Sequence, residues 1–144
     1  MLEVGARPMT GQEYLESLRD GREVYIHGER VRDVTTHPAF RNAARSIARL
    51  YDALHDPEYR EVLTGRDRFG LLTHKFFKPS YAPQELLEAR DAIACWARLT
   101  YGFMGRTPDY KASFMATLGA APEFYEPFTD NAARWYREYA SRVL

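Results

Sequence analysis

The segment Tyr101–Lys111 places a glycine-rich break between two stretches of helical spacing, so the chain must turn there. Gly102 and Gly105 accept the positive φ angles that such a turn requires. The run Thr107–Asp109 then supplies a good N-cap, a proline suited to the first helical position, and a carboxylate suited to the positive end of a helix dipole. We therefore expect a helix–turn–helix unit in which one helix ends near Gly102 and another begins after Thr107.

Apolar residues at helical spacing also predict helices elsewhere, with one β-hairpin between the first two. The hairpin joins Val24–Ile26 to Arg30–Arg32 through the turn His27–Gly28. The segment Thr64–Ala82 has no regular pattern and is expected to be an ordered loop. The fold class is therefore mainly α, with a small β-hairpin. The expected helices run from Thr10 to Gly21, from Thr36 to Asp56, from Pro57 to Leu63, from Pro83 to Gly102, from Thr107 to Leu118, and from Thr129 or Asp130 onward. Gly119 is expected to close the fifth helix. The inner face of the last helix is expected to carry Ala132, Tyr136, Tyr139 and Val143.

Size and composition favour one globular domain over residues 1–144 and exclude several classes of partner. Twenty basic and twenty acidic residues cancel, so no overall field attracts nucleic acid or an anionic membrane. No apolar run approaches the roughly 20 residues needed to span a bilayer. Cys95, the only cysteine, cannot form an internal disulfide and is expected to be a buried, inert thiol. We expect a cytoplasmic protein.

Metal binding is not expected, because the four histidines and the acidic residues lack metal-ligand spacing. The run His74–Lys78 sets cations around two phenylalanines. This pattern favours a surface loop with an apolar anchor, although it also fits a pocket wall for an anionic aromatic ligand.

Arg106 and Tyr110 are the residues whose types and positions best suit the binding of a ligand. Arg106 precedes the expected N-cap and Tyr110 lies in the first helical turn, so both project near unpaired backbone N–H groups. Such sites attract carboxylates and phenolates. An Arg–Tyr pair that only packs at the surface remains the alternative.

The chain resembles the flavin-dependent 4-hydroxyphenylacetate 3-monooxygenase family (oxygenase component), over nearly its whole length. The longest run behind this resemblance is Arg98–Lys111. Further runs are Met9–Asp20, Arg22–Ile26, Asp33–Ala44, Leu50–Pro57 and Thr73–Phe77.

The resemblance implies an amino-terminal helical domain of an acyl-CoA-dehydrogenase-like protein. The flavin-binding middle domain and the carboxy-terminal helical bundle would lie beyond residue 144, which makes this chain a fragment that is inactive alone. The implied reaction is ortho-hydroxylation of 4-hydroxyphenylacetate to 3,4-dihydroxyphenylacetate with O2 and FADH2. The implied partners are a separate NADH-dependent flavin reductase and further copies of the chain in a homotetramer.

The resemblance also assigns site residues. Arg106 and Tyr110 match the positions that contact the phenolic hydroxyl in the family, while Thr107, Pro108 and Asp109 between them shape the turn and belong to the substrate site. The flavin site residues are expected beyond residue 144.

Two alternatives remain open from the sequence. The same scaffold serves other phenol hydroxylases of tyrosine, coumarate or chlorophenol type and, more distantly, a hydroxybutyryl-CoA dehydratase. The dehydratase requires metal-cluster ligands, which the lone Cys95 does not supply. If 144 residues were the native length, the chain would instead be a non-catalytic binding module.

Overall fold

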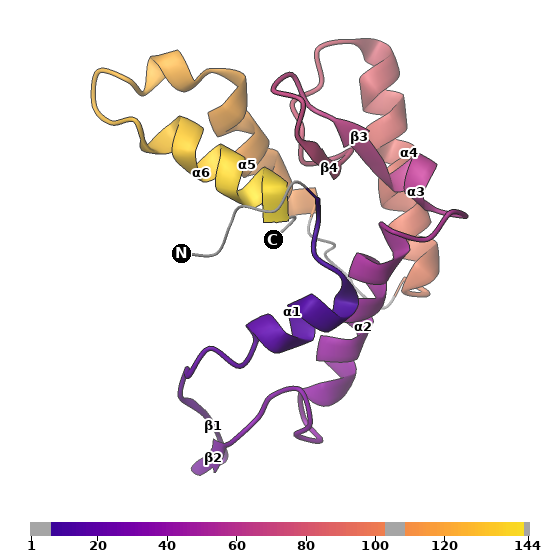
Figure 1. Cartoon of the computed structure of the whole chain (residues 1–144), viewed down its shortest axis with the longest axis vertical. Coiled ribbons are helices and arrows are strands. Elements are labelled where there is room, and N and C mark those ends of the chain that lie inside the picture. Colours follow the sequence, from indigo (N-terminus) through magenta and orange to yellow (C-terminus); the bar gives the residue numbers. More distant parts are fainter. Residues whose placement is uncertain (1–6, 103–108, 143–144) are drawn as a thin grey trace.

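Helices form most of the architecture in the computed structural model, which describes residues 7–102 and 109–142 (Figure 1). The prediction of a mainly α domain with a small hairpin is confirmed. In chain order the elements are α1 (Gly11–Ser17), β1 (Val24–Ile26), β2 (Glu29–Val31), α2 (Arg41–Ala53), α3 (Arg60–Leu63), β3 (Thr64–Arg66), β4 (Leu72–His74), α4 (Pro83–Leu99), α5 (Asp109–Ala120), the 3-10 turn η1 (Pro122–Phe124) and α6 (Asn131–Arg142).

Helix α1 begins at the expected capping box and packs closely on α2. The Thr10 hydroxyl accepts a hydrogen bond from the Glu13 amide at 3.2 Å, and the Glu13 carboxylate accepts one from the Thr10 amide at 2.6 Å. The Gly11 amide donates to the Asp52 carboxylate of α2 at 2.7 Å. A Cβ atom at Gly11 would lie 2.4 Å from the Ala48 carbonyl oxygen, so only glycine permits this approach of the two helices.

Strands β1 and β2 form the expected hairpin, with the second strand starting one residue earlier than predicted. Ile26 pairs with Glu29 across a two-residue turn. His27 and Gly28 in this turn have φ angles of 51° and 82°, the left-handed values that a tight hairpin turn needs.

Helix α2 begins later than predicted. Its first helical residue is Arg41, and the stretch from Thr36 to Phe40 forms turns instead. Pro38 disfavours helical backbone at the residue before it, which lies inside this stretch. The Phe40 amide donates to the His37 carbonyl at 3.0 Å, so the chain forms a turn before α2 begins.

The expected loop Thr64–Ala82 contains a second antiparallel hairpin, which the sequence analysis missed. Thr64 pairs with His74 and Arg66 with Leu72. The Asp67 carboxylate closes the connecting turn by accepting hydrogen bonds from the Phe69 and Leu71 amides, both at 2.9 Å. Each strand is only three residues long, too short for alternation to be recognised.

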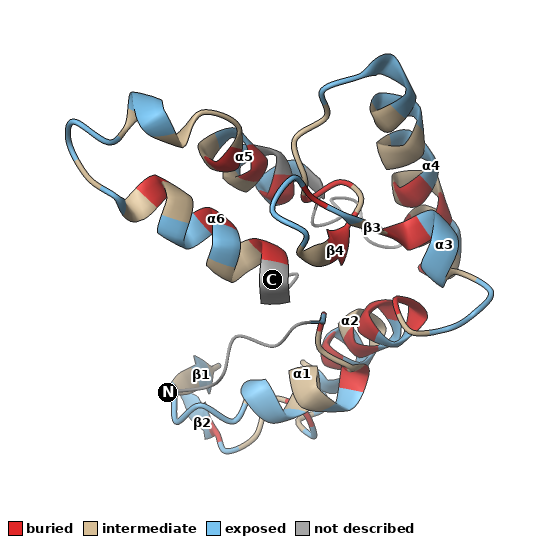
Figure 2. Ribbon diagram, turned by 45° about the horizontal axis from the view of Figure 1, so that its top comes forward, coloured by how far each residue is buried: buried red, intermediate tan, exposed pale blue. Residues whose placement is uncertain are grey.

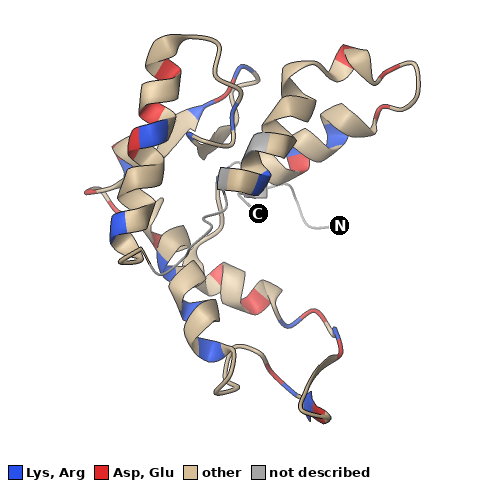
Figure 3. Cartoon of the chain, turned by 180° about the vertical axis from the view of Figure 1, so that it is seen from behind, with Lys and Arg blue, Asp and Glu red and all other residues tan. Residues whose placement is uncertain are grey.

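The main core lies where α2, α3, β4 and α4 meet, and buried residues gather there in Figure 2. Charged residues of both signs are interspersed over the rest of the chain (Figure 3), in keeping with its zero formal charge. The residues buried in this core are Leu50, Tyr51, Ala53, Leu54, Leu63, Phe76, Phe77, Ala92, Cys95, Trp96 and Ala112.

Helices α5 and α6 pack side by side, and α6 packs against β4 (Figure 1). The prediction that Gly119 closes α5 is wrong, since the helix continues to Ala120. Gly119 is buried, and a Cβ atom there would lie 2.3 Å from Cδ2 of the Tyr136 ring. This glycine therefore serves close helix packing rather than helix termination. Val143, expected on the inner face of α6, lies outside the described residues.

Candidate functional site

The candidate site surrounds the connection from α4 to α5. Arg106, Thr107 and Pro108 lie outside the described residues. Helix α5 begins at Asp109, directly after the proposed cap and proline, and Tyr110 lies in its first turn. The prediction of a helix here is confirmed from Asp109 on, while the capping role of Thr107 and the roles of Arg106 and Tyr110 remain predictions.

The end of α4 sets the direction in which the chain enters this connection. The Thr100 hydroxyl donates to the Trp96 carbonyl at 3.1 Å, and the Gly102 amide donates to the Ala97 carbonyl at 2.8 Å. Tyr101 and Gly102 both adopt left-handed φ angles, 54° and 68°. Such hydrogen bonds give partners to the last carbonyl groups of a helix, which otherwise have none within the helix. They also fix the direction of the chain that follows the helix.

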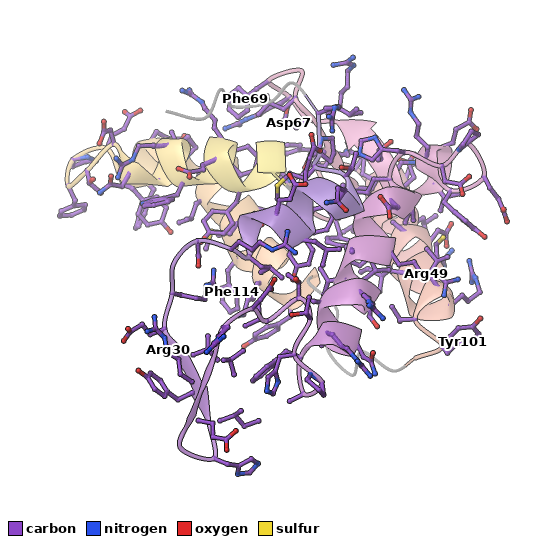
Figure 4. The ribbon with its side chains drawn as sticks, turned by 60° about the horizontal axis from the view of Figure 1, so that its bottom comes forward. Arg30, Arg49, Asp67, Phe69, Tyr101 and Phe114 are labelled. Atoms are coloured by element: carbon purple, nitrogen blue, oxygen red, sulfur yellow. The ribbon has the colours of Figure 1, made fainter. Side chains whose placement is uncertain are left out.

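The Tyr101 ring is exposed, and the Arg49 guanidinium of α2 lies 5.9 Å from its centre (Figure 4). This cation–π contact links the end of α4 to α2. The left-handed tyrosine was not expected from the sequence, because glycine is the usual residue at such a position.

Helix α5 has two distinct faces. Ala112, Ala116 and Gly119 are buried on one face, and small residues there permit close packing. Tyr110 and Phe114 lie on the opposite face and are 51% and 58% exposed. Their rings contact each other edge to face, with centres 5.3 Å apart and an interplanar angle of 88°.

The second hairpin holds the far end of α5 and the middle of α6. The buried Tyr136 hydroxyl donates to the Asp67 carboxylate at 2.9 Å. Burial, together with this hydrogen bond, raises the pKa of Tyr136 far above its ordinary value. The Arg68 guanidinium donates to the Gly119 carbonyl at 2.6 Å, near the negative end of the α5 dipole.

This junction of Asp67, Arg68, Gly119 and Tyr136 was not recognised in the sequence. Each residue type was visible, but the contacts join positions 51 to 69 residues apart. A single sequence carries no signal for pairings of that kind.

The side chains of the run His74–Lys78 make contacts within the fold, as an apolar anchor would. His74, Phe76 and Phe77 are buried, with the His74 and Phe76 ring centres 3.6 Å apart. Lys75 pairs with Glu88 at 3.6 Å, and Lys78 pairs with Glu85, both on α4. The described rings and cations are therefore used within the fold.

Burial of His74 lowers the pKa of its imidazole well below the ordinary value, and the neighbouring Lys75 adds to this shift. The His74 Nε2, Trp96 Nε1 and Thr73 Oγ1 atoms have no hydrogen-bond partner among the described residues. This part of the core therefore holds a neutral histidine.

The described residues offer little for cofactor chemistry. No group of three potential metal ligands occurs within residues 7–102 and 109–142. Cys95 is buried, and the desolvation raises the pKa of its thiol, as expected for an inert cysteine.

A cavity of about 270 Å³ lies between the end of α1 and the first hairpin, lined by residues such as Leu18, Arg22 and Val31. Within the described ranges, every helix is too short or too polar to cross a membrane.

Comparisons with known proteins match the chain to the amino-terminal part of oxygenase components. Residues 10–144 match the family model described as "4-hydroxyphenylacetate 3-hydroxylase N terminal". The chain is 62% identical over 143 residues to the 4-hydroxyphenylacetate 3-monooxygenase oxygenase component of Pseudomonas aeruginosa. It is 61% identical over 143 residues to the 4-nitrophenol 2-monooxygenase oxygenase component of a Rhodococcus species. Each match covers 96% of this chain but 27% of the relative, so the chain spans about a quarter of the length of these proteins.

A solved structure shows the same arrangement of elements. It is the crystal structure of the oxygenase component of 4-hydroxyphenylacetate 3-monooxygenase complexed with FAD and 4-hydroxyphenylacetate. It superposes with a TM-score of 0.81 at 36% identity, covering 91% of this chain and 28% of the other.

Proposed function

The chain belongs to the 4-hydroxyphenylacetate 3-hydroxylase family, and from this we propose that it is the amino-terminal part of an FADH2-utilising monooxygenase. The proposed reaction is ortho-hydroxylation of 4-hydroxyphenylacetate to 3,4-dihydroxyphenylacetate with O2. The observation that carries this proposal is the match of residues 10–144 to the amino-terminal family model, supported by relatives at 61% and 62% identity that are both oxygenase components.

Identity alone does not select the substrate, because relatives named for two different phenols differ by one percentage point. Both named substrates carry a hydroxyl group para to a second substituent. Both names also place the new oxygen at the carbon next to the hydroxyl-bearing carbon. We therefore propose a para-substituted phenol as the substrate class and 4-hydroxyphenylacetate as its most suitable member; another phenol hydroxylase specificity is the runner-up.

Residues 1–144 form the helical amino-terminal domain in this proposal, and a flavin-binding middle domain and a helical bundle complete the acyl-CoA-dehydrogenase-like enzyme. The supporting fact is that the relatives are about four times longer, with this chain covering 27% of them. Alone, the chain would supply part of the substrate wall and would not hydroxylate phenols.

Arg106 and Tyr110 would act on the phenolic oxygen. Hydroxylation next to a phenol hydroxyl is easier when that hydroxyl is deprotonated or strongly hydrogen-bonded. The Arg106 guanidinium stays charged at any working pH and would stabilise the developing phenolate. The Tyr110 hydroxyl would hydrogen-bond to the same oxygen and fix the orientation of the substrate ring. Thr107, Pro108 and Asp109 would set the turn that brings these two side chains together.

Reduced FAD, bound by the complete enzyme, would supply the electrons that activate O2. The cavity of about 270 Å³ between the end of α1 and the first hairpin is smaller than typical ligand pockets of roughly 300–1,000 Å³, so we do not propose it as the flavin site. We assign no flavin contact within this chain. The proposed partners are an NADH-dependent reductase that delivers FADH2 and further copies of the enzyme in a homotetramer, all in the cytoplasm.

A chimaeric enzyme tests this function. This chain would replace the matching amino-terminal segment of the Pseudomonas aeruginosa relative, to which it is 62% identical. The chimaera would receive chemically reduced FAD, O2 and 4-hydroxyphenylacetate, and the dihydroxylated product would be quantified by chromatography. We expect product formation, whereas a folded, flavin-binding chimaera that converts no phenol would refute the proposal.

Variants of the same chimaera test the site. Arg106→Ala should lower hydroxylation by orders of magnitude while flavin binding stays unchanged. Tyr110→Phe removes one hydrogen bond of about 0.5–1.5 kcal/mol, which corresponds to a loss of roughly 2- to 12-fold in kcat/KM. Arg90→Ala, at an exposed position of α4, is the matched control and should leave turnover unchanged. Equal turnover in Arg106→Ala and the parent would refute the assigned role.

A further inference from the structure

We infer that Phe114 is a positioning residue for Tyr110, holding the tyrosine hydroxyl where the substrate's phenolic oxygen would bind. The inference rests on the proposed function, because it assumes that Tyr110 contacts the phenol. The observation behind it is the edge-to-face contact between the Tyr110 and Phe114 rings, at 5.3 Å and 88°.

Helix geometry explains why these two rings meet. Residues four positions apart lie one above the other on the same helix face. Side chains on a helix lean toward its amino terminus, so the Phe114 ring leans back over the turn that carries Tyr110. The edge-to-face arrangement is one of the orientations that aromatic rings prefer.

Core packing does not account for Phe114. The buried residues Ala112 and Ala116 lie on the opposite face of α5, whereas Phe114 is 58% exposed. In Figure 4, Phe114 lies apart from Asp67 and Phe69 of the second hairpin. A helix with apolar residues on both faces is typical of one that is covered on both sides in its working state.

The contact has a direct consequence for the tyrosine oxygen. Rotation of the Tyr110 ring about its own axis leaves the hydroxyl oxygen in place, but rotation about the Cα–Cβ bond swings it through several ångströms. The Phe114 ring contacts the Tyr110 ring edge to face in its present rotamer, and we infer that this contact favours that rotamer over the others. Misplacing a catalytic contact by about 1 Å can cost on the order of 100-fold in rate, so holding this rotamer matters for catalysis.

The first test uses the 144-residue chain with isotope-labelled tyrosine. Three-bond NMR couplings report the rotamer of Tyr110 about its Cα–Cβ bond. We expect a single dominant rotamer in the parent and in Phe114→Tyr, which keeps the ring, and averaged couplings in Phe114→Ala. Phe124→Ala is the matched control, because Phe124 is also exposed and also contacts a tyrosine, Tyr125, edge to face at 5.2 Å. An unchanged Tyr110 rotamer in Phe114→Ala would overturn the inference.

The second test is a double-mutant cycle in the active chimaera. Phe114→Ala should lower kcat/KM by roughly 3- to 10-fold when Tyr110 is present, within the range that an aromatic pair contributes. In the Tyr110→Phe background the same change should have an effect of less than about twofold, because the hydroxyl on which Phe114 acts is already absent. A purely structural role would give equal losses in both backgrounds and would overturn the inference.

The two proposals fail in different ways. Equal turnover in Tyr110→Phe and the parent would refute the proposed role of Tyr110 and the inference with it. A loss in Tyr110→Phe together with unchanged turnover in Phe114→Ala would overturn the inference alone.

Discussion

Replacement of Gly119 by alanine should destabilise the chain, although alanine is the better helix former. Gly119 lies inside α5, where the intrinsic preference for alanine over glycine is worth about 1 kcal/mol. A glycine-to-alanine change at an exposed helix position would show this gain in stability. Gly119 instead faces the ring of Tyr136, which is only 1% exposed.

The size of the clash decides the sign of the effect. A Cβ atom at Gly119 would lie 2.3, 2.4 and 2.6 Å from Tyr136 ring atoms, while carbon atoms in contact prefer separations of about 3.5–4.0 Å. The ring cannot retreat freely, because its hydroxyl donates to the buried Asp67 carboxylate at 2.9 Å. Overpacking costs about 1–3 kcal/mol, and a displaced hydrogen bond costs about 1 kcal/mol more. After subtraction of the helix-propensity gain, the expected net loss is about 1–3 kcal/mol.

Urea unfolding followed by far-UV circular dichroism measures this free energy of unfolding directly. The parent, Gly119→Ala and the control Lys111→Ala, at an exposed position of the same helix, should be compared. We expect Lys111→Ala to match the parent within about 0.5 kcal/mol. We also expect Gly119→Ala to cost less when Tyr136 is already replaced by leucine, because contacting positions are not additive. If Gly119→Ala were as stable as the parent or more stable, the close approach of α5 and α6 at this point would be refuted.

Three further predictions concern the described residues. Tyr136→Phe should lower the free energy of unfolding by about 1–3 kcal/mol in the same urea assay, because the buried Asp67 carboxylate loses a donor; an unchanged midpoint would contradict that. The pKa of His74 in the folded chain lies well below its value of about 6.5 in the unfolded chain. Its contribution to the free energy of unfolding is therefore complete above pH 6.5, and it is lost as the pH falls below that value. Unfolding measured from pH 8 to pH 5 should show this loss in the parent and a weaker one in His74→Phe. Thr10→Ala removes the capping hydroxyl that accepts from the Glu13 amide and should cost about 0.5–2 kcal/mol, whereas Thr10→Ser should retain most of the stability.

Local signals in the sequence were sufficient for most helices and for the first hairpin. The signals that sufficed act within a few residues: they are the capping box at Thr10, the turn His27–Gly28 and the proline at the start of α4. Where local signals conflicted, the prediction was wrong. Pro38 disfavours helical backbone at the residue before it, and α2 begins only at Arg41, after a turn closed by the Phe40 amide and the His37 carbonyl.

The candidate site was predictable only in part. The sequence identified the family, and it predicted a turn at Arg106 that lies outside the described residues. It did not reveal that Phe114 contacts Tyr110, because four-residue spacing is shared by many pairs that never touch. It also assigned Gly119 to helix termination, since glycine is common at helix ends and a single sequence does not show which helix packs against it.

By itself, then, the sequence determined the helical class, the positions of most elements and the oxygenase family, because these depend on periodicity, capping and long specific motifs. Only the tertiary structure decided which face of α5 is buried, why Gly119 must lack a side chain and how Asp67 meets Tyr136. The physical reason is distance along the chain. Hydrogen bonds and close packing between residues 17 and 69 positions apart leave no local pattern, and they form only when the helices and the second hairpin have come together.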